Sequence, residues 1–280
     1  MKPTDIAQPD YFHKVVDCQW ACPAHTPVPE YIRLIAQGRY DDAYLVNWKS
    51  NVFPGILGRT CDRPCEPACR RVRVEEGSPE HRKAHAKPEA VAICRLKRAA
   101  ADYKGDIRPH LPKPAAKGNG KRVALVGAGP ASLTVARDLA PHGYQCVVFD
   151  GDPKAGGMMR TQIPKFRLPD RVIDEECGYV LDLGVEFRAG TRVDSMASLL
   201  ADGYDAVFVG SGAPRGRDLD IPGRREAAKH IHIGIDWLSS VSFGHTTSIG
   251  KRVVVLGGGN TAMDCCRSAR RLGGEEVHVV

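Results

Sequence analysis

The sequence lacks any long run of hydrophobic residues. Its apolar runs at 123–126 and 253–256 are four residues long, whereas a membrane-spanning helix needs about 20. The first ten residues, MKPTDIAQPD, contain two acidic side chains and no apolar stretch of the kind that secretory signals carry. These absences predict a soluble, cytoplasmic protein that does not bind a membrane.

Aromatic residues are also scarce, at 6% of 280 residues, and this scarcity bears on the chain's positive charge. The formal net charge is +7, and residues 1–120 hold 20 basic and 14 acidic side chains. A nucleic-acid surface is one explanation, but acidic residues interrupt the basic stretch and no aromatic side chains are interleaved with it, as single-strand binding requires. The pattern favours positive charge around an anionic cofactor or an acidic protein partner over nucleic acid.

Cysteine, by contrast, is abundant: the chain has ten, and six fall in the first 94 residues. In a chain without an export signal, clustered cysteines indicate metal or redox chemistry before disulfides. The six are Cys18, Cys22, Cys61, Cys65, Cys69 and Cys94. The other four, Cys146, Cys177, Cys265 and Cys266, lie in predicted strands or helices and are interpreted as small buried apolar residues.

The periodicity of the chain changes at about residue 120. Before it, short helices are expected within 26–50 and at about 89–103, and the Pro- and Gly-containing stretch 105–120 is typical of a linker. After it, a strand–glycine loop–helix–strand unit occurs twice. The predicted fold class is therefore α/β, with two dinucleotide-binding folds preceded by an all-α domain. The predicted domains are 1–104 (helical), 105–120 (linker), 121–215 (first nucleotide fold) and 216–280 (start of the second). Because the second fold breaks off at Val280, the sequence predicts a chain shortened relative to its natural length.

The first glycine loop directly follows a predicted strand and directly precedes a predicted helix. Gly127 allows the tight turn, Gly129 lets the backbone approach a pyrophosphate, and the helix N-terminus supplies unpaired N–H groups. Asp150 ends the next strand, where a carboxylate binds ribose hydroxyls. The predicted binding residues of the loop are Gly127, Gly129, Pro130, Ala131 and Ser132. Since Ser132 stands where Gly or Ala is usual, the packing of helix on strand has to accommodate a hydroxyl.

The second glycine loop has the same context and the predicted binding residues Gly257, Gly259, Asn260, Thr261 and Ala262. The position that would separate NAD from NADP lies beyond Val280. Other predicted cofactor contacts are Gly156, Gly157, Arg160, Arg167 and Gly212. Each glycine loop has an alternative interpretation as an ordinary strand-to-helix turn that binds nothing, but two such loops in one chain weigh against it.

A series of segments now points to a known family. The segments are GAGPAS (127–132), GG (156–157), IPKFRLP (163–169), VGSGAPR (209–215), IPG (221–223) and GGGNTAMD (257–264), with VPEYIRLI (28–35), GRY (38–40) and GRTCDRPCEPAC (58–69) upstream. Together they resemble the small subunit of glutamate synthase and the flavin half of dihydropyrimidine dehydrogenase. The resemblance implies FAD on the first nucleotide fold, NAD(P)H on the second, and [4Fe–4S] clusters in residues 1–104. The family's C-terminal flavin-binding segment is absent from these 280 residues.

The cysteines depart from the family pattern. Relatives with two clusters carry cysteines where this chain has Asp10 and His13, and Glu or Gln where it has Lys97, which is no iron ligand. Cys94, on the same helix face as Lys97, can supply the missing ligand. The resemblance implies Cys22, Cys61 and Cys65 as ligands of one cluster, and helix spacing adds Cys94, which leaves Cys18 and Cys69 spare or holding a second cluster. Structural Zn²⁺ and vestigial thiols are the alternatives; Pro23 after Cys22 favours iron–sulfur.

The expected function is that of an NAD(P)H-dependent, FAD-containing electron-transfer subunit, because a nicotinamide moves two electrons and a cluster only one. No side chain is typical of a catalytic base or nucleophile. The expected partner is a larger catalytic oxidoreductase subunit (of glutamate synthase, 2-oxoacid or aldehyde oxidoreductase type), a ferredoxin-like subunit, or both. The alternative is an assembly scaffold without redox activity that retains the nucleotide folds.

Overall fold

The structure, a computed structural model, describes residues 16–72 and 89–280. The chain forms two compact units, Met1–Leu111 and Pro112–Val280. The division between them falls inside the segment 105–120 that the sequence predicts as a linker. No helix in the described residues is long and apolar enough to span a membrane.

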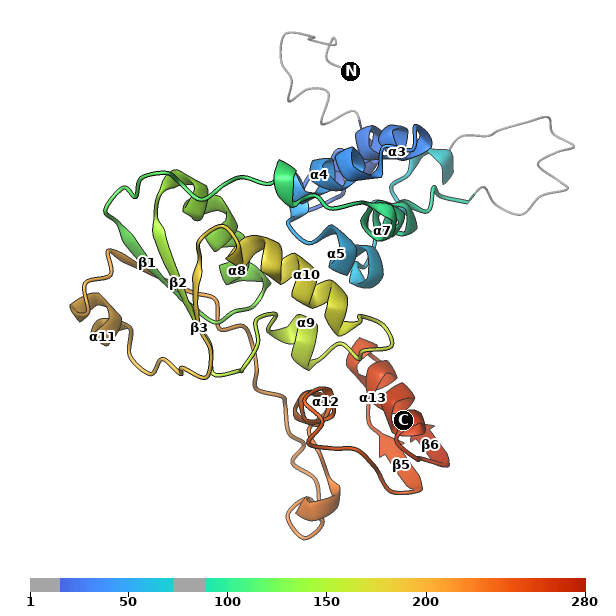
Figure 1. Cartoon of the computed structure of the whole chain (residues 1–280). Helices are drawn as coiled ribbons and strands as arrows, with labels where there is room; N and C mark the ends of the chain where they lie inside the picture. Colours follow the sequence, from blue (N-terminus) through green and yellow to red (C-terminus); the bar gives the residue numbers. More distant parts are fainter. Residues whose placement is uncertain (1–15, 73–88) are drawn as a thin grey trace, which may run out of the picture. The chain divides into compact units, whose positions relative to one another are not determined.

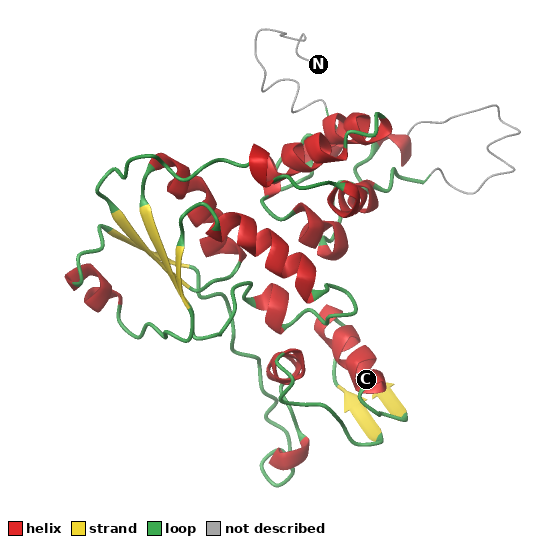
Figure 2. Cartoon of the chain, viewed as in Figure 1, coloured by secondary structure: helices red, strands yellow, loops and turns green. Residues whose placement is uncertain are grey.

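The first unit is helical in its described part (Figures 1 and 2). Its elements are α2 (Asp17–Trp20), α3 (Val28–Ala36), α4 (Tyr40–Asn51), α5 (Pro54–Thr60), α7 (Ile93–Tyr103) and the short 3-10 helices η1 (Arg70–Val72) and η2 (Arg108–His110). Pro29 lies in the first turn of α3, and Gly38, with φ of +72°, follows its end. Helices α3, α4 and α7 match the predicted helical stretches, whereas α5 was not predicted.

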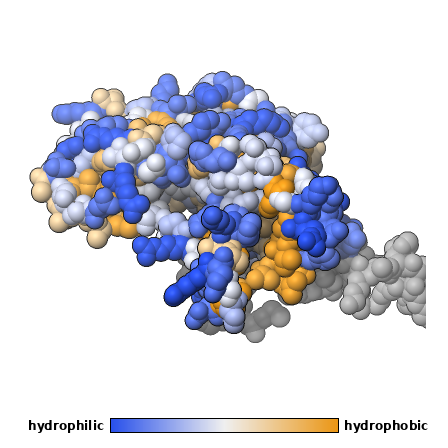
Figure 3. Space-filling model, turned by 90° about the horizontal axis from the view of Figure 1, so that it is seen from below, coloured by the Kyte–Doolittle hydropathy of each residue, from blue (hydrophilic) through white to orange (hydrophobic). Residues whose placement is uncertain are grey.

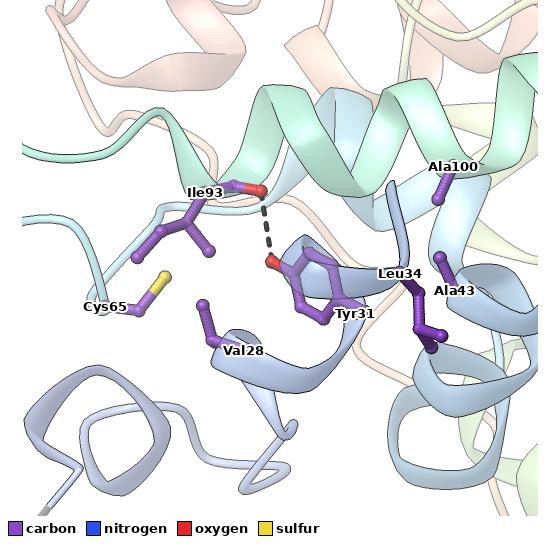
Figure 4. Close-up of a cluster of buried hydrophobic side chains, with 7 residues drawn as sticks. All are labelled: Val28, Tyr31, Leu34, Ala43, Cys65, Ile93 and Ala100. Atoms are coloured by element: carbon purple, nitrogen blue, oxygen red, sulfur yellow. Dashed lines mark hydrogen bonds between the residues drawn. The ribbon is translucent and has the colours of Figure 1, made fainter. Parts of the chain in front are cut away.

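The core of the first unit is built around Tyr31. Its side chain is fully buried, and its hydroxyl donates a hydrogen bond of 3.1 Å to the carbonyl oxygen of Ile93, which joins α3 to the start of α7 (Figure 4). Burial of one such large side chain stabilises the fold by roughly 1.5–3 kcal/mol. The buried residues packed together here are Val28, Tyr31, Leu34, Ala43, Cys65, Ile93 and Ala100. One cysteine of the predicted cluster set therefore lies directly in this core.

Helices α5 and α7 approach each other closely at Gly58. A Cβ atom at this position would lie 2.7 Å from the backbone nitrogen and Cα of Arg98, so only glycine permits this packing distance. The close approach also places the start of α7 beside the end of α5, which directly precedes Cys61.

The second unit contains a four-stranded parallel sheet. Its strands are β1 (Arg122–Val126), β2 (Gln145–Phe149), β3 (Glu186–Arg188) and β4 (Ala206–Val209), in the order β3-β2-β1-β4. The helices that follow or connect them are α8 (Pro130–Leu139), η3 (Ala140–His142), α9 (Met158–Thr161), α10 (Asp170–Leu181) and α11 (Met196–Ala201). Leu199 of α11 packs with Ala124, Val147 and Phe149 on one face of the sheet. Helices α8 and α10 lie on the other side (Figure 1), as parallel sheets require.

A second, two-stranded parallel sheet pairs β5 (Arg252–Val255) with β6 (Glu276–Val279). The connecting helix α13 (Asn260–Arg271) and helix α12 (Gly234–Ser242) cover one face with Trp237, Leu238 and Ala269. A short 3-10 helix, η4 (Ala228–His230), precedes α12. Val254, Leu256 and Val280 are 61%, 56% and 78% exposed. Figure 3 shows that hydrophobic side chains also gather on one face of the protein surface.

Candidate functional site

The first glycine loop turns sharply between β1 and α8. Gly127 has φ of +94°, and a Cβ atom there would lie 2.5 Å from the carbonyl oxygen of Gly210. Its N–H donates to the carbonyl oxygen of Phe149 at 2.7 Å, while the N–H of Gly210 donates to Val126 at 2.8 Å. Both the backbone conformation and the neighbouring strand therefore require glycine at position 127.

Gly129 is different, because the protein itself leaves room for a side chain there. Its φ is −81°, and the atoms nearest to an added Cβ, the Cα of Gly157 and the carbonyl oxygen of Gly210, are 4.0 Å away. Gly129 directly precedes Pro130 and the first turn of α8, whose N–H groups have no intrahelical acceptor. A glycine that packing does not demand, at the N-terminus of a ten-residue helix, fits the close approach of a pyrophosphate.

The Gly156–Gly157 pair folds back onto this loop. The N–H of Gly156 donates to the carbonyl oxygen of Ala128 at 2.9 Å, and a Cβ on Gly157 would lie 2.7 Å from the Cα of Gly129. Both glycines have positive φ, at +134° and +50°. The structure thus brings two predicted contact segments, distant in sequence, into one backbone-lined site.

Gly210, which was not among the predicted site residues, makes room for the side chain of Ser132. That side chain is fully buried, and its hydroxyl has no hydrogen-bond partner. A Cβ on Gly210 would lie 2.2 Å from that hydroxyl oxygen, so the missing side chain at Gly210 provides the space for Ser132. The run of small residues 210–213 after β4 could have indicated this close packing. Only Gly212 of this run was predicted as a binding residue. Gly212 is exposed and has φ of +68°.

Asp150 holds the loop in place. One carboxylate oxygen accepts the Ala128 N–H at 2.5 Å, and the other accepts the Asp152 N–H at 2.9 Å. Burial and the nearby Asp150 charge together raise the pKa of Asp152. The predicted contact of Asp150 with ribose stays a prediction, since in this structure its oxygens face the backbone of the loop.

Arg160 and Arg167, both predicted to contact a cofactor, form ion pairs within the protein, and their contact with a cofactor stays a prediction. Arg160 is 6% exposed; it donates to the carbonyl oxygen of Ala155 at 2.9 Å and pairs with Asp174 at 2.5 Å. Arg167 pairs with the buried Asp264 of α13 at 2.5 Å. These contacts join α9 to α10, and the segment after α9 to the second nucleotide fold.

The second glycine loop is open. Gly257 has φ of +109°, and its N–H donates to the carbonyl oxygen of Val280 at 2.7 Å. A Cβ on Gly257, Gly258 or Gly259 would meet no atom within 4 Å. Asn260 and Thr261 begin α13 and are exposed, whereas Ala262 is buried where the helix packs on the strands. The loop therefore presents the helix N-terminus to solvent, as a nucleotide site requires.

Four of the six N-terminal cysteines form one electrostatic group. Cys65 is coupled to Cys61 and Cys22, and Cys94 is coupled to Cys61. Cys94 also donates from its Sγ to the carbonyl oxygens of Leu57 and Gly58, at 3.4 Å each. The four residues expected to be ligands therefore lie within range of one another's charges, and their ligation of a cluster stays a prediction.

The thiols of this group differ in acidity. Burial raises the pKa of Cys65 to about 11, helped by the nearby Cys61. Burial would likewise raise the pKa of Cys22, but hydrogen bonds from Thr26 and Ala24 and the charge of Lys97 hold it below its ordinary value. The Sγ of Cys22 lies 3.4 Å from the Thr26 hydroxyl. Cys22 is therefore the thiol most readily converted to the thiolate that binds metal.

Cys18 lies near Cys69, and it also packs against the core that contains Cys65. Burial raises the pKa of Cys18, and Cys69 adds to the effect. An ion pair of 3.0 Å between Asp17 and Arg70, the residues next to these two cysteines, joins their segments. Asp10 and His13, which replace the family's further ligands, lie outside the described residues.

The arrangement of the thiols bears on the kind of metal. In the described residues, no three His, Cys, Asp or Glu side chains are grouped closely enough to hold a single metal ion. Four thiols are a donor set that both structural zinc and a [4Fe–4S] cube accept.

The remaining cysteines behave largely as expected. Burial raises the pKa of Cys146 and Cys265 to about 11 and that of Cys177 to about 12, so these thiols are inert at neutral pH. Cys266 is the exception, because it is only partly buried on the outer side of α13.

Comparison with known protein families matches both units. Residues 121–280 match the pyridine nucleotide-disulphide oxidoreductase family. This chain belongs to that family. Residues 12–108 match dihydropyrimidine dehydrogenase domain II, described as a 4Fe–4S cluster domain. The matches confirm the predicted fold class and the resemblance to the small subunit of glutamate synthase. They also confirm the predicted oxidoreductase family and its cofactor classes, FAD, NAD(P)H and [4Fe–4S]. They do not favour the alternative of a scaffold without redox activity.

Individual relatives of this oxidoreductase align over nearly the whole chain. The NADPH-Fe(3+) oxidoreductase subunit beta of Geobacter sulfurreducens is 36% identical over 98% of the chain, and the NADP(+)-dependent formate dehydrogenase subunit beta of Moorella thermoacetica is 36% identical over 94%. The glutamate synthase [NADPH] small chain of Escherichia coli is 34% identical over 93%. The chain spans 40%, 39% and 55% of these relatives' own lengths.

Among solved structures, a 2-naphthoyl-CoA reductase complex is similar to this oxidoreductase, with a TM-score of 0.50 and 20% identity. The similarity covers 88% of this chain and 35% of that one. At this identity, the similarity concerns the fold alone. It extends over more of the chain than either family match does separately.

Proposed function

We propose that this chain is the electron-input part of a larger oxidoreductase. It takes a hydride from NAD(P)H onto FAD and passes single electrons through one [4Fe–4S] cluster to a larger catalytic subunit, to a ferredoxin-like subunit, or to both. The direction can also run in reverse, towards NAD(P)⁺. The cofactor classes follow from the family; the path through these particular residues is the proposal.

One observation carries it: Cys61 lies near Cys65 and Cys94, and Cys22 lies near Cys65, in a chain whose other unit holds a backbone-lined glycine site. The glycine site suits a two-electron cofactor with a pyrophosphate, and the thiols suit a one-electron centre. A chain that carries both is equipped to convert hydride transfer into single-electron transfer.

The chain's own residues would bind and orient the flavin nucleotide. The backbones of Gly129 and Gly157 leave the surface of the loop bare, and the first turn of α8 offers N–H donors to the pyrophosphate. Asp150 fixes the loop through the Ala128 N–H. Bound FAD supplies the chemistry that accepts a hydride and releases electrons one at a time. Gly257, Gly259 and the N-terminus of α13 would bind the nicotinamide nucleotide in the same way.

The proposed domains are 1–104 for the cluster, 105–120 as linker, 121–215 for FAD and 216–280 for NAD(P). The proposed ligands are Cys22, Cys61, Cys65 and Cys94, with Cys18 and Cys69 outside the cluster. The names of the relatives specify different partners and reactions, namely Fe(3+), formate and glutamate synthesis. Each of these relatives contains a region similar to this chain, which supports a common electron-input role with an acceptor set elsewhere.

The test is an anaerobic titration of the FAD-loaded chain with NADPH and, separately, with NADH. Bleaching of the flavin absorption, followed by loss of the broad iron–sulfur absorption, is the expected result. A chain that binds FAD and iron but is reduced by neither nucleotide would contradict the proposal. Dithionite, which reduces both centres directly, serves as the positive control for their integrity.

A further inference from the structure

Lys97 occupies an unusual place for a lysine. It lies on the buried face of α7 together with Ile93, Cys94 and Ala100, at helical spacings that otherwise carry apolar side chains. It is 7% exposed, whereas the neighbouring cations Arg95 and Arg98 on the same helix are exposed. An ammonium group is strongly hydrated in water, so burying it is costly unless a negative charge compensates.

The described residues contain no carboxylate that forms an ion pair with Lys97. The groups that do experience its charge are the thiols of Cys22, Cys65 and Cys94, which come from three different segments. Tyr31 also faces these thiols, but its hydroxyl donates to the Ile93 carbonyl and stays uncharged, since burial raises its pKa. Neutral thiols do not balance a buried cation, whereas thiolates do.

A [4Fe–4S] cube held by four thiolates carries a net negative charge and gains another on reduction. Hydrogen bonds to the sulfurs, local charge and burial set the potential at which this happens. Cys94 and Lys97 are one helical turn apart on the same face, so a cube bound by Cys94 lies within reach of the Lys97 side chain.

We propose that Lys97 is the buried counter-charge of the cluster, a positioning residue that makes it easier to reduce. The inference rests on the proposed function. Lys97 is not a ligand, because a protonated amine has no lone pair for iron. Its positive charge would offset the negative charge that the cluster gains when it takes one electron from the reduced flavin.

The experiment compares four anaerobically purified full chains: wild type, Lys97→Met, Lys97→Arg and Arg95→Met. Lys97→Met removes the buried charge at similar size, Lys97→Arg keeps a charge, and Arg95→Met removes an exposed charge from the same helix. Iron and acid-labile sulfide are counted first. A redox titration followed by electron paramagnetic resonance then gives the midpoint potential of the cluster.

Lys97→Met should keep its iron and lower the midpoint. At the midpoint potential of the wild type, the ratio of reduced to oxidised cluster in Lys97→Met should fall by at least about tenfold. This fall corresponds to a midpoint potential lowered by about 59 mV for a one-electron couple. Arg95→Met should match wild type. An unchanged midpoint in iron-loaded Lys97→Met overturns the inference and leaves the proposed function intact.

If Lys97→Met loses its iron, the iron content of Lys97→Arg shows whether the site requires a positive charge or only a packed side chain. Iron retained by the arginine variant supports the requirement for charge, whereas folded protein without iron in both variants means that Lys97 acts through packing and overturns the inference. A wild type without iron would instead overturn the proposed function itself, and the inference with it.

Discussion

At the scale of single residues, glycines in the first nucleotide fold serve two separate needs. Gly127, Gly157 and Gly210 are required by the chain itself, because an added Cβ would lie 2.5, 2.7 and 2.2 Å from neighbouring atoms. Gly129 has no such neighbour. The sequence pattern treats Gly127, Gly129 and Gly157 alike, and only the structure separates packing from binding.

Gly129→Ala should therefore weaken FAD binding without weakening the fold. The added methyl group has room within the protein but occupies the path of the pyrophosphate. We expect at least a tenfold loss of FAD affinity, measured by quenching of flavin fluorescence, with an unchanged melting temperature. Gly151→Ala, whose Cβ would also meet no atom within 4 Å, is the matched control. Equal FAD affinity in Gly129→Ala and wild type would remove Gly129 from the site.

The cysteines allow a second test at this scale. Cys94→Ala should lower iron content to half of the wild-type value or less and leave the remainder sensitive to oxygen, because three thiolates hold a cube poorly. Cys18→Ala should do little, since Cys18 is not one of the four proposed ligands. Iron and sulfide analysis of both variants, prepared without oxygen, makes the comparison. Equal losses would mean that Cys18 is also a ligand.

At the scale of elements, the contact between the IPKFRLP segment and α13 joins the two nucleotide folds. Arg167 pairs with Asp264, and the guanidinium groups of Arg267 and Arg271 stack over Phe166 at 4.6 and 3.9 Å from its centroid. Cation–π contacts at partly exposed sites are worth about 0.5–1 kcal/mol each. Arg167, a predicted cofactor contact, has a partner on another element in the structure.

Asp264→Asn should destabilise the second unit by about 1–3 kcal/mol. Breaking a fully buried pair costs about 3–5 kcal/mol, and the effect is smaller here because Arg167 is 28% exposed on its side chain. Urea unfolding measures the change. The exposed pair Arg192–Asp194, at 83% and 80%, offers the control Asp194→Asn, for which we expect almost no effect. Equal stability of Asp264→Asn and wild type would show that the pair does not hold the folds together.

Helices α5 and α7 are joined by Asp102, which pairs with both Arg59 and Arg98. Burial alone would raise the pKa of Asp102, but the two arginines lower it below its ordinary value. A carboxyl group with a lowered pKa stabilises the fold above about pH 4 and loses this contribution as the pH falls further. The difference in unfolding free energy between wild type and Asp102→Asn should therefore shrink on acidification. A difference independent of pH would contradict the ion pair.

The sequence predicts most elements and fewer of the side-chain roles. Strand β1, the glycine loop and α8 follow from a buried apolar run, two glycines and Pro130, which are all local signals. Helix α5 was missed because its packing depends on Gly58 lying against Arg98, a contact between residues 40 positions apart. The same reason explains three other features that were not predicted, namely the role of Gly210, the partners of Arg160 and the burial of Lys97. Each depends on tertiary neighbours that no local pattern encodes.

At the scale of the whole molecule, the two units divide the chemistry between them. The helical unit holds neighbouring thiols, and the α/β unit presents two helix N-termini behind glycine loops. The second sheet leaves Val254, Leu256 and Val280 exposed on the face opposite α13. Parallel sheets are normally covered on both faces, and the chain spans 40% of its Geobacter relative.

The central claim is that an iron–sulfur cube and a flavin site occur together in this one chain. Its most direct test is a count of iron, acid-labile sulfide and FAD in chain purified without oxygen and loaded with FAD. The account predicts about four iron and four sulfide per chain, and FAD that remains bound through gel filtration. Zinc in place of iron, or a chain free of metal that is nevertheless folded, would contradict it.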